Sequence, residues 1–382
     1  MTAQSDTHDW QRQVELVVVP SFACNLRCTH CFIGRRATRS SMGARDFLAL
    51  VDQVGKLGLR AMQLTGGEPF AWRHHDRALP ALAELGIPAA VSTNGALLYP
   101  AAAAALAGSS VSLCLSLDGP PRTHDQQRGV GAFASTEAAA ALCRQHDIRF
   151  DISSVVTRAS LPEVAATTAA AAALGASAIY FSPLQRLGGR SDKLADQRLT
   201  DDECVELLAA LTVLRDHVPA GFRVFSQNLG MRPTAVKSPC SVFACWGEFC
   251  PSQKRWPSRL YVLPDGTVLP QSLHIHPRYA LGNAFREGLD VVIGRYWGSA
   301  KHAEFQALCR YVYQDLIYGS RRPFFFWDEL VRWASDRPAG ELPVYTTVTH
   351  PHDHTEEIAR ARRQDRLPLI SFPIRAGRSA AG

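Results

Sequence analysis

A chain of 382 residues in which 46% are hydrophobic and 20% are charged can bury a sizeable core, which excludes global disorder. The net charge of +6 is mild for this length, and the first 180 residues contain no basic runs, so we expect an anionic ligand rather than a nucleic acid. The N-terminal segment lacks the features of a signal peptide, and no apolar run approaches the ~20 residues of a membrane span, which favours a cytoplasmic protein without a membrane partner.

Short apolar runs alternate with helical patterns along the first 180 residues. The apolar runs predict strands at Val14–Val19, Met62–Leu64, Ala89–Ser92, Val111–Leu117, Phe150–Val156 and Ile179–Phe181. The patterns between them predict helices at Ala44–Leu57, Arg77–Leu85, Ala101–Ala107, Thr136–Gln145 and Leu161–Leu174. Repeated strand–helix alternation is typical of a parallel sheet, so we expect an α/β fold, a partial (β/α)6 barrel whose functional residues follow the strand ends.

The pattern changes after about residue 225, where prolines interrupt the chain repeatedly. The segment Leu260–Leu269 predicts a β-hairpin that turns at Asp265-Gly266, and helical patterns follow from about Leu289 to Trp333. We therefore expect an N-terminal extension at 1–13 and the partial barrel at 14–232. A smaller C-terminal domain with the hairpin and helices follows at 233–335, and a polar tail at 336–382.

Three cysteines follow the first predicted strand on one short loop: Cys24, Cys28 and Cys31. In a reducing compartment such spacing indicates metal binding or catalysis rather than disulfides. Three thiolates can each bind one iron of a cubane cluster and leave the fourth iron open. The alternatives are core cysteines or a zinc loop, although His30 is poorly placed to be a fourth zinc ligand. Other cysteines lie in strand or helix patterns and are expected to be buried: Cys114, Cys143 and Cys204.

The spacing C-x3-C-x2-C resembles the signature of the radical S-adenosylmethionine (SAM) superfamily, and the resemblance covers at least residues 14–190. His30 stands where that family usually has an aromatic residue. Gly66-Gly67-Glu68-Pro69, after the second predicted strand, looks like the family's GGEP motif, whose backbone and carboxylate receive the amino group of SAM. Glycines let the backbone approach a ligand closely, and a glutamate can pair with an ammonium group.

Polar segments at the ends of the third and fourth predicted strands resemble further family motifs, Ser92–Gly95 and Ser116–Gly119. The segment from His124 to Phe133 is similar to one found in members that bear a SPASM or twitch extension. The alternatives here are an ordinary turn at Asn94-Gly95 and a helix cap at Asp118. The SAM contacts that the resemblance implies are Phe32, Gly66, Gly67, Glu68, Asn94, Ser116 and Arg128.

The resemblance implies two cofactors, a [4Fe–4S] cluster on the three loop cysteines and SAM. The open iron would chelate the amino and carboxylate groups of SAM, and an electron from a donor such as flavodoxin or ferredoxin would break the S–C5′ bond. The resulting 5′-deoxyadenosyl radical would abstract hydrogen from a substrate. The alternative outside the enzymes is a non-catalytic iron–sulfur or zinc binding protein.

The second predicted domain resembles the start of a SPASM or twitch domain, which carries auxiliary iron–sulfur clusters. Cys240, Cys245 and Cys250 precede the hairpin, but Gln271 stands where the family has a further cysteine, and only Cys309 follows. One interpretation gives the three cysteines a single unusual auxiliary cluster. The interpretation that we favour keeps the fold without such clusters, since a neutral amide is a poor ligand for this type of cluster.

Family members with such extensions either mature peptides or modify small molecules. We expect a small-molecule substrate, because little sequence precedes the first predicted strand and the auxiliary cysteines are incomplete. The substrate would be a sugar, aminocyclitol or nucleoside-like intermediate of a natural product, and the positive net charge of the chain suggests that it is anionic. The reaction would be a dehydrogenation, epimerisation or decarboxylation. The alternative is a peptide maturase that forms thioether or carbon–carbon crosslinks.

Overall fold

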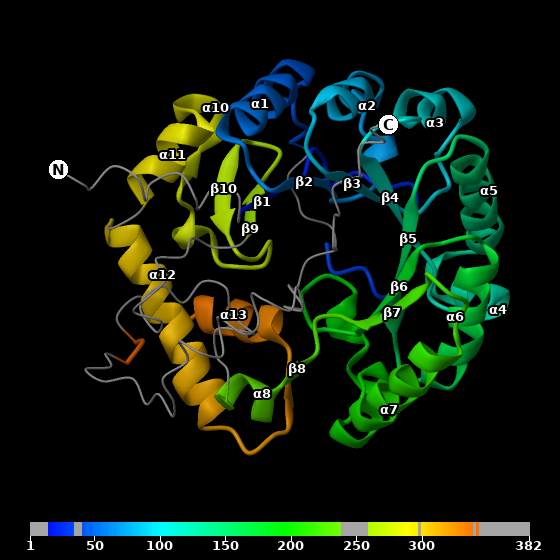
Figure 1. Cartoon of the computed structure of the whole chain (residues 1–382). Helices are drawn as coiled ribbons and strands as arrows, with labels where there is room; N and C mark the ends of the chain where they lie inside the picture. The colour runs from blue at the N-terminus through cyan, green and yellow to red at the C-terminus, as the bar shows by residue number, and fades with distance from the viewer. Residues whose placement is uncertain (1–13, 34–39, 238–258, 297–298, 339–340, 344–382) are drawn as a thin grey trace. The chain divides into compact units, whose positions relative to one another are not determined.

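The computed structural model describes residues 14–33, 40–237, 259–296, 299–338 and 341–343, which form two compact units (Figure 1). The barrel unit comprises the described residues of Val18–Gly55 and Met62–Gln227. The hairpin unit comprises those of Met1–Val17, Lys56–Ala61 and Asn228–Pro373. Short segments near the N-terminus thus belong to the hairpin unit, and the domain limits expected from the sequence stay a prediction.

The strands of the barrel unit form a parallel sheet in chain order, β2-β3-β4-β5-β6-β7. Their bounds are Ala61–Leu64, Ala89–Thr93, Val111–Ser116, Phe150–Val156, Ala178–Pro183 and Arg223–Ser226. The register places Cys114 beside Asp151 and Ser153 beside Tyr180. The expected α/β fold with a partial barrel is confirmed, and β7 adds a strand that the apolar pattern did not predict.

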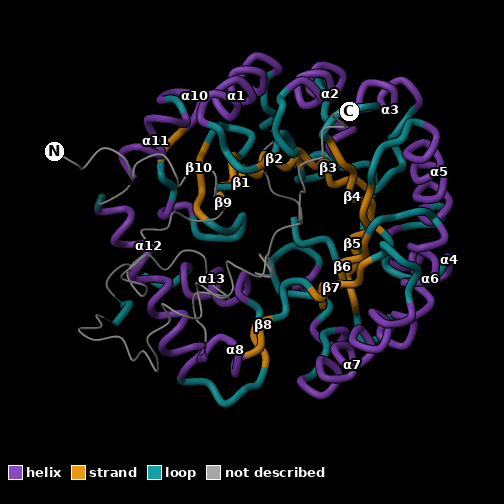
Figure 2. The backbone as a smooth tube through the Cα atoms, viewed as in Figure 1, coloured by secondary structure: helices purple, strands orange, loops and turns teal. Residues whose placement is uncertain are grey.

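Helices cover the outer side of this curved sheet, as the tube view shows (Figure 2). They are α1 Ala44–Leu57, α2 His75–Glu84, α3 Pro100–Leu106, α4 Pro121–Arg128, α5 Ala132–Gln145, α6 Val164–Ala173 and α7 Asp201–His217. Short 3-10 turns lie at Pro69–Ala71, Leu161–Glu163, Ser191–Lys193 and Ala195–Gln197. Helices α4 and α7 were not predicted from the sequence, although Thr200 and Glu203 form a capping box that marks the start of α7.

The two faces of the sheet differ in chemistry. Leu113, Leu115 and Ile152 alternate with the polar positions of their strands and are almost completely buried. On the opposite face, Cys114 and Asp151 are also buried. A buried carboxylate is unusual there, because strands that are covered on both faces are usually apolar throughout. The helix-free face of the sheet therefore presents polar groups below the strand ends that carry the family-like motifs.

The hairpin unit contains the strand order β11-β10-β9-β1, with bounds Gly282–Asn283, Thr267–Pro270, Arg259–Val262 and Glu15–Val18. A second ladder pairs β8, Gly230–Met231, with β12, Phe324–Phe325. The helices are α8 Arg232–Lys237, α10 Ala284–Glu287, α11 Leu289–Tyr296, α12 Ala300–Tyr311 and α13 Trp327–Ser335. A 3-10 turn lies at Pro277–Tyr279 and a π-helix at Val312–Tyr318.

The predicted hairpin is present, because β9 and β10 pair antiparallel and turn at Asp265-Gly266, where Gly266 has a φ of 85°. An ion pair joins β9 to β1, because the buried Glu15 carboxylate of β1 accepts a hydrogen bond from Arg259 Nη2 of β9 at 3.2 Å. The same carboxylate accepts a hydrogen bond from Arg60 Nη2 at 3.4 Å. Gln271 follows the hairpin with a φ of 62°, a backbone conformation that is uncommon for any residue except glycine. Among the described helices, none combines the length and the apolar character that crossing a membrane requires.

Candidate active site

The three loop cysteines lie between β1 and α1 in the barrel unit, Cys24 exposed and Cys28 and Cys31 half-buried, all as free thiols. The Leu26 backbone N–H donates to Cys24 Sγ at 3.4 Å, and the Cys31 N–H donates to the Cys28 carbonyl at 3.3 Å. Within the described residues, no three His, Cys, Asp or Glu side chains are gathered around one metal-ion position. A cubane cluster does not need that arrangement, since each thiolate binds a different iron.

The donor chemistry of this loop fits a cluster. The pKa of the Cys24 thiol is raised to about 11, chiefly by burial and also by the Glu68 carboxylate and the neighbouring thiols, against a hydrogen bond from Leu26. Burial also raises the pKa of Cys28, while the Arg128 guanidinium lowers it. Metal binding displaces such thiol protons, so iron would replace them as the positive partner of the sulfurs. Other cysteines are buried as the sequence predicts: Cys114, Cys143 and Cys204.

Gly66 and Gly67 bring the end of β2 directly against the cysteine loop. The Gly67 N–H donates to the Ser21 carbonyl at 3.0 Å, and the Glu68 N–H donates to the Ala23 carbonyl at 2.8 Å. A Cβ on Gly67 would lie 2.0 Å from the Ala23 carbonyl oxygen, and Gly66 has a φ of 126°. Both glycines are therefore required by contacts within the chain itself, a reason that the motif alone did not reveal.

The Glu68 carboxylate is buried, with 1% of the residue exposed, and it joins the ends of β2 and β3. Oε1 accepts hydrogen bonds from Thr93 Oγ1 at 2.7 Å and from the Phe70 N–H at 3.1 Å, and Oε2 accepts one from the Asn94 N–H at 2.8 Å. Burial raises the pKa of Glu68, although these hydrogen bonds oppose the shift. That this carboxylate also receives the amino group of SAM stays a prediction.

Asn94 and Ser116 follow at the ends of β3 and β4. The Asn94 Nδ2 group donates to Asn25 Oδ1 at 2.9 Å and lies 3.9 Å from Cys24 Sγ, so this side chain touches the cysteine loop. The Ser116 hydroxyl donates to the Thr93 carbonyl at 3.4 Å. The structure thus brings three predicted site residues, Glu68, Asn94 and Cys24, into one connected group.

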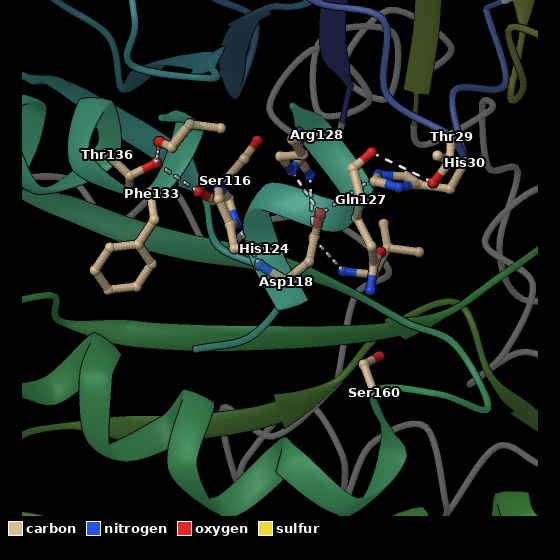
Figure 3. Close-up of polar contacts among 12 residues, drawn as sticks. Thr29, His30, Ser116, Asp118, His124, Gln127, Arg128, Phe133, Thr136 and Ser160 are labelled. Carbon is tan, nitrogen blue, oxygen red and sulfur yellow. Dashed lines mark hydrogen bonds and ion pairs between the residues drawn. The ribbon is translucent and has the colours of Figure 1, made fainter. Parts of the chain in front are cut away.

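Arg128 forms a two-pronged ion pair with Asp118, a residue that the sequence analysis considered only as a helix cap (Figure 3). Nε and Nη2 of Arg128 donate to Oδ2 and Oδ1 of Asp118 at 2.5 and 3.1 Å, and the Val155 N–H donates to Oδ1 at 2.9 Å. Burial favours the neutral acid, but Arg128 and His30 prevail and hold the pKa of Asp118 below its usual range. The helix-cap alternative is wrong, because Asp118 binds a guanidinium instead.

His30 is buried beside this pair, with its Nε2 3.5 Å from Asp118 Oδ2, and burial lowers its pKa to about 4. His124 lies on the other side, where its Nδ1 accepts a hydrogen bond from the Asp118 N–H at 3.0 Å. The Thr29 N–H donates to the Gln127 carbonyl at 2.8 Å, which ties the cysteine loop to α4 (Figure 3). The His124–Phe133 segment carried a signal for these contacts, and the predicted SAM contact of Arg128 within it stays a prediction.

The remaining predicted site residues stay predictions. Phe32 follows the last loop cysteine and is 40% exposed, and its contact with SAM is untested. The possible auxiliary ligands Cys240, Cys245 and Cys250 lie outside the described residues. Gln271 is described, and its buried Oε1 accepts no hydrogen bond from any described group.

Comparison with known proteins assigns part of this chain to a family. Residues 18–164 match the Radical SAM superfamily. A heme synthase that depends on S-adenosylmethionine, from Methanosarcina barkeri, is 32% identical over 182 residues, which are 45% of this chain and 51% of that protein. The mycofactocin maturase MftC of Mycolicibacterium smegmatis is 26% identical over 284 residues, 70% of this chain and 66% of the maturase. The chain spans about half the length of the heme synthases that it matches.

Solved structures share the fold. The structure of Streptococcus suis SuiB bound to S-adenosylmethionine superposes with a TM-score of 0.64 at 18% identity, over 77% of this chain and 68% of SuiB. That of anSMEcpe with bound S-adenosylmethionine gives a TM-score of 0.60 at 19% identity, over 84% of this chain and 88% of anSMEcpe. At these identities the likeness establishes the fold alone.

Proposed function

Because residues 18–164 are a radical SAM domain, whose family uses a [4Fe–4S] cluster and SAM, we propose that the whole chain is an enzyme that cleaves SAM reductively and abstracts hydrogen from a substrate. The observation that carries the proposal is the connected group at the strand ends. Asn94 of β3 touches Cys24, and Glu68 after β2 binds the Ala23 carbonyl within the same loop. The ends of two neighbouring strands thus bind the cysteine loop directly.

Cys24, Cys28 and Cys31 would hold the cluster. When bound, the cluster and SAM supply an electron and a 5′-deoxyadenosyl radical. The chain's own residues position them: Glu68 fixes the Asn94 backbone, and Asn94 in turn holds Asn25 beside Cys24. An external one-electron donor such as flavodoxin or ferredoxin belongs to this proposal, because reductive cleavage of SAM consumes an electron.

The substrate would lie against the helix-free face of the barrel sheet. Asp151 is buried there, its Oδ1 accepts no hydrogen bond among the described residues, and burial raises its pKa. Tyr180 lies on the next strand, stacked on Phe225 at 5.0 Å between ring centroids. A substrate with hydrogen-bond donors and a flat or apolar portion would suit these groups.

Two substrate classes remain in the proposal. Peptide maturation is supported by the relatives that extend furthest along this chain: the match to the mycofactocin maturase covers 70% of it, and a SuiB structure of the same fold holds a precursor peptide. A small-molecule substrate, as expected from the sequence, is supported by the heme synthase, which has the higher identity but matches only 45% of the chain. We give the peptide class first place, because its supporting match extends into the hairpin unit.

The test begins with anaerobic reconstitution with iron and sulfide and an assay for 5′-deoxyadenosine after addition of dithionite and SAM. The parent should produce it, and Cys28→Ala should lose both cluster and activity, since two remaining thiolates should not keep a cubane in place. Cys204→Ala, which removes a buried cysteine of α7 far along the chain, is the control and should behave like the parent. A Cys28→Ala protein with a normal cluster and normal 5′-deoxyadenosine yield would refute the proposal.

The substrate class is tested by supplying candidates to the active protein. Short peptides encoded beside its gene, and the sugars or nucleosides made by neighbouring enzymes, would be incubated separately with SAM and dithionite. The product mixture would be examined by mass spectrometry for a loss of two hydrogens, which a dehydrogenation or a crosslink produces, or of carbon dioxide, and by chromatography for an epimer of unchanged mass. A modified peptide would establish maturation, and a modified small molecule would reverse the order given above.

A further inference from the structure

Arg190 lies in the loop that follows β6, 159 residues after the last loop cysteine, yet it binds the backbone of the cysteine loop. Its own N–H donates to the Cys31 carbonyl at 2.9 Å. Its Nη1 donates to the Cys28 carbonyl at 3.3 Å and also to the Arg27 carbonyl. One residue thus binds the carbonyls of two predicted cluster ligands, Cys28 and Cys31, and that of Arg27.

The loop around Arg190 forms a hydrogen-bonded turn that positions this residue. Gly188 and Gly189 have φ values of 107° and 63°, which residues with side chains adopt rarely. The Gly188 N–H donates to Asp192 Oδ1 at 2.9 Å, and Ser191 Oγ donates to the Gly188 carbonyl at 2.7 Å. This closed turn fixes the Arg190 backbone independently of its side chain. The contacts with the cysteine loop therefore cost little additional backbone conformational entropy.

We propose that Arg190 is a positioning residue for the iron–sulfur cluster, which it serves by fixing the spacing of Cys28 and Cys31 and by placing a permanent positive charge beside them. Groups behind metal ligands commonly set both the affinity of a site and its reduction potential. A guanidinium stays charged at all physiological pH values, and it stabilises the more negative, reduced form of a nearby cluster. The inference rests on the proposed function, because it requires that the three cysteines hold a cluster.

The experiment uses the full-length, anaerobically reconstituted protein without SAM and compares the parent with Arg190→Met and Arg190→Lys. Two quantities are measured: the rate at which a chelator removes iron, and the midpoint potential of the cluster followed by electron paramagnetic resonance. Arg122→Met, which removes an exposed positive charge from α4, is the control for net charge. Neither quantity requires a substrate or a turnover assay.

In Arg190→Met the chelator should remove iron about tenfold faster than in the parent, in line with the usual effect of removing a group that orients ligands, and the midpoint potential should become more negative. Arg190→Lys should also lose iron faster, since the lysine ammonium is carried on a flexible stem and lacks the rigid planar geometry of the guanidinium, but its potential should stay close to that of the parent. Arg122→Met should match the parent in both measurements.

A reconstituted parent without any iron would contradict the proposed function itself. A parent with a normal cluster, together with an Arg190→Met protein that has the parent's potential and rate of iron loss, would overturn the role of Arg190 alone. If Arg190→Met fails to fold, as judged by circular dichroism, the lysine variant still decides: unchanged iron loss in Arg190→Lys would overturn the positioning role.

Discussion

At the scale of single residues, buried polar side chains connect the strand ends to the cysteine loop. Glu68 shows the principle, because its two carboxylate oxygens accept hydrogen bonds from the side chain of Thr93 and from the backbone of Asn94 and Phe70. Such a group is costly to remove, since its donors would be left buried without acceptors. The sequence motif therefore has a structural role in addition to any contact with SAM.

Replacement of Glu68 by alanine should weaken SAM binding while the cluster persists. The loss of a charge-assisted hydrogen bond of roughly 1.5–3 kcal/mol corresponds to about a tenfold to hundredfold loss of affinity, measurable by equilibrium dialysis with labelled SAM. Thr93→Val removes only one donor to the carboxylate and should cost less. An unchanged SAM affinity in Glu68→Ala would mean that the carboxylate serves only to join β2 and β3.

His124 predicts a pH dependence of stability. Burial lowers its pKa to about 4, while Asp118 opposes the shift, so the folded protein holds it neutral where the unfolded chain, with a pKa near ~6.5, is already protonated. The unfolded state binds more protons between these values, so the free energy of unfolding should fall as pH drops from about 6.5 to about 4, by on the order of 3 kcal/mol. Urea unfolding at several pH values measures this. His124→Gln should reduce the slope in that interval, and the slope that remains belongs to His30, whose pKa burial also lowers to about 4.

At the scale of elements, the barrel unit depends on close approach between a loop and a strand end. Gly67 allows the segment after β2 to lie against residues 21–23, because a side chain there would overlap the Ala23 carbonyl. The next anchor is α4, whose Gln127 carbonyl accepts the Thr29 N–H. The cysteine loop is thus positioned by elements that follow it in the chain.

Substitution of Gly67 by alanine should displace the cysteine loop, because the new Cβ would lie 2.0 Å from a backbone oxygen that cannot rotate away. We expect a loss of more than 1 kcal/mol in the free energy of unfolding, typical of overpacking, and a lower iron content after reconstitution. Gly294→Ala in α11 is the matched control, since its Cβ would meet no atom within 4 Å and should stabilise the helix by about 0.5–1 kcal/mol. Equal iron contents in the two variants would show that the loop tolerates the displacement.

At the scale of the whole molecule, the open question is how many clusters the chain carries. The hairpin of the second unit is present, and Gln271 follows it where the resembled pattern has cysteine. Its amide is a poor ligand for iron in a sulfide cluster, so we propose a SPASM-like fold without auxiliary clusters.

We expect about four irons and four sulfides per reconstituted chain, the content of one cubane. Simultaneous replacement of Cys240, Cys245 and Cys250 by alanine should leave the iron content and the electron paramagnetic resonance signal close to those of the parent. About eight irons in the parent and four in the triple variant would reverse this proposal. A second cluster would also favour an oxidation or crosslinking reaction, because it could accept an electron from the substrate radical.

Sequence alone was enough to predict the parallel α/β fold and the hairpin, because strand periodicity and turn residues are local properties of the chain, and the cofactors followed from the resemblance of its motifs to a family. It could not predict the partners of Arg128 and Arg190. The Asp118 carboxylate binds the Arg128 guanidinium because α4 turns back toward the end of β4, and the Cys31 carbonyl accepts the N–H of Arg190 from a loop that is distant in the sequence. Tertiary structure therefore decided which polar residues surround the cysteines, because hydrogen bonds depend on distances in space that no local pattern encodes.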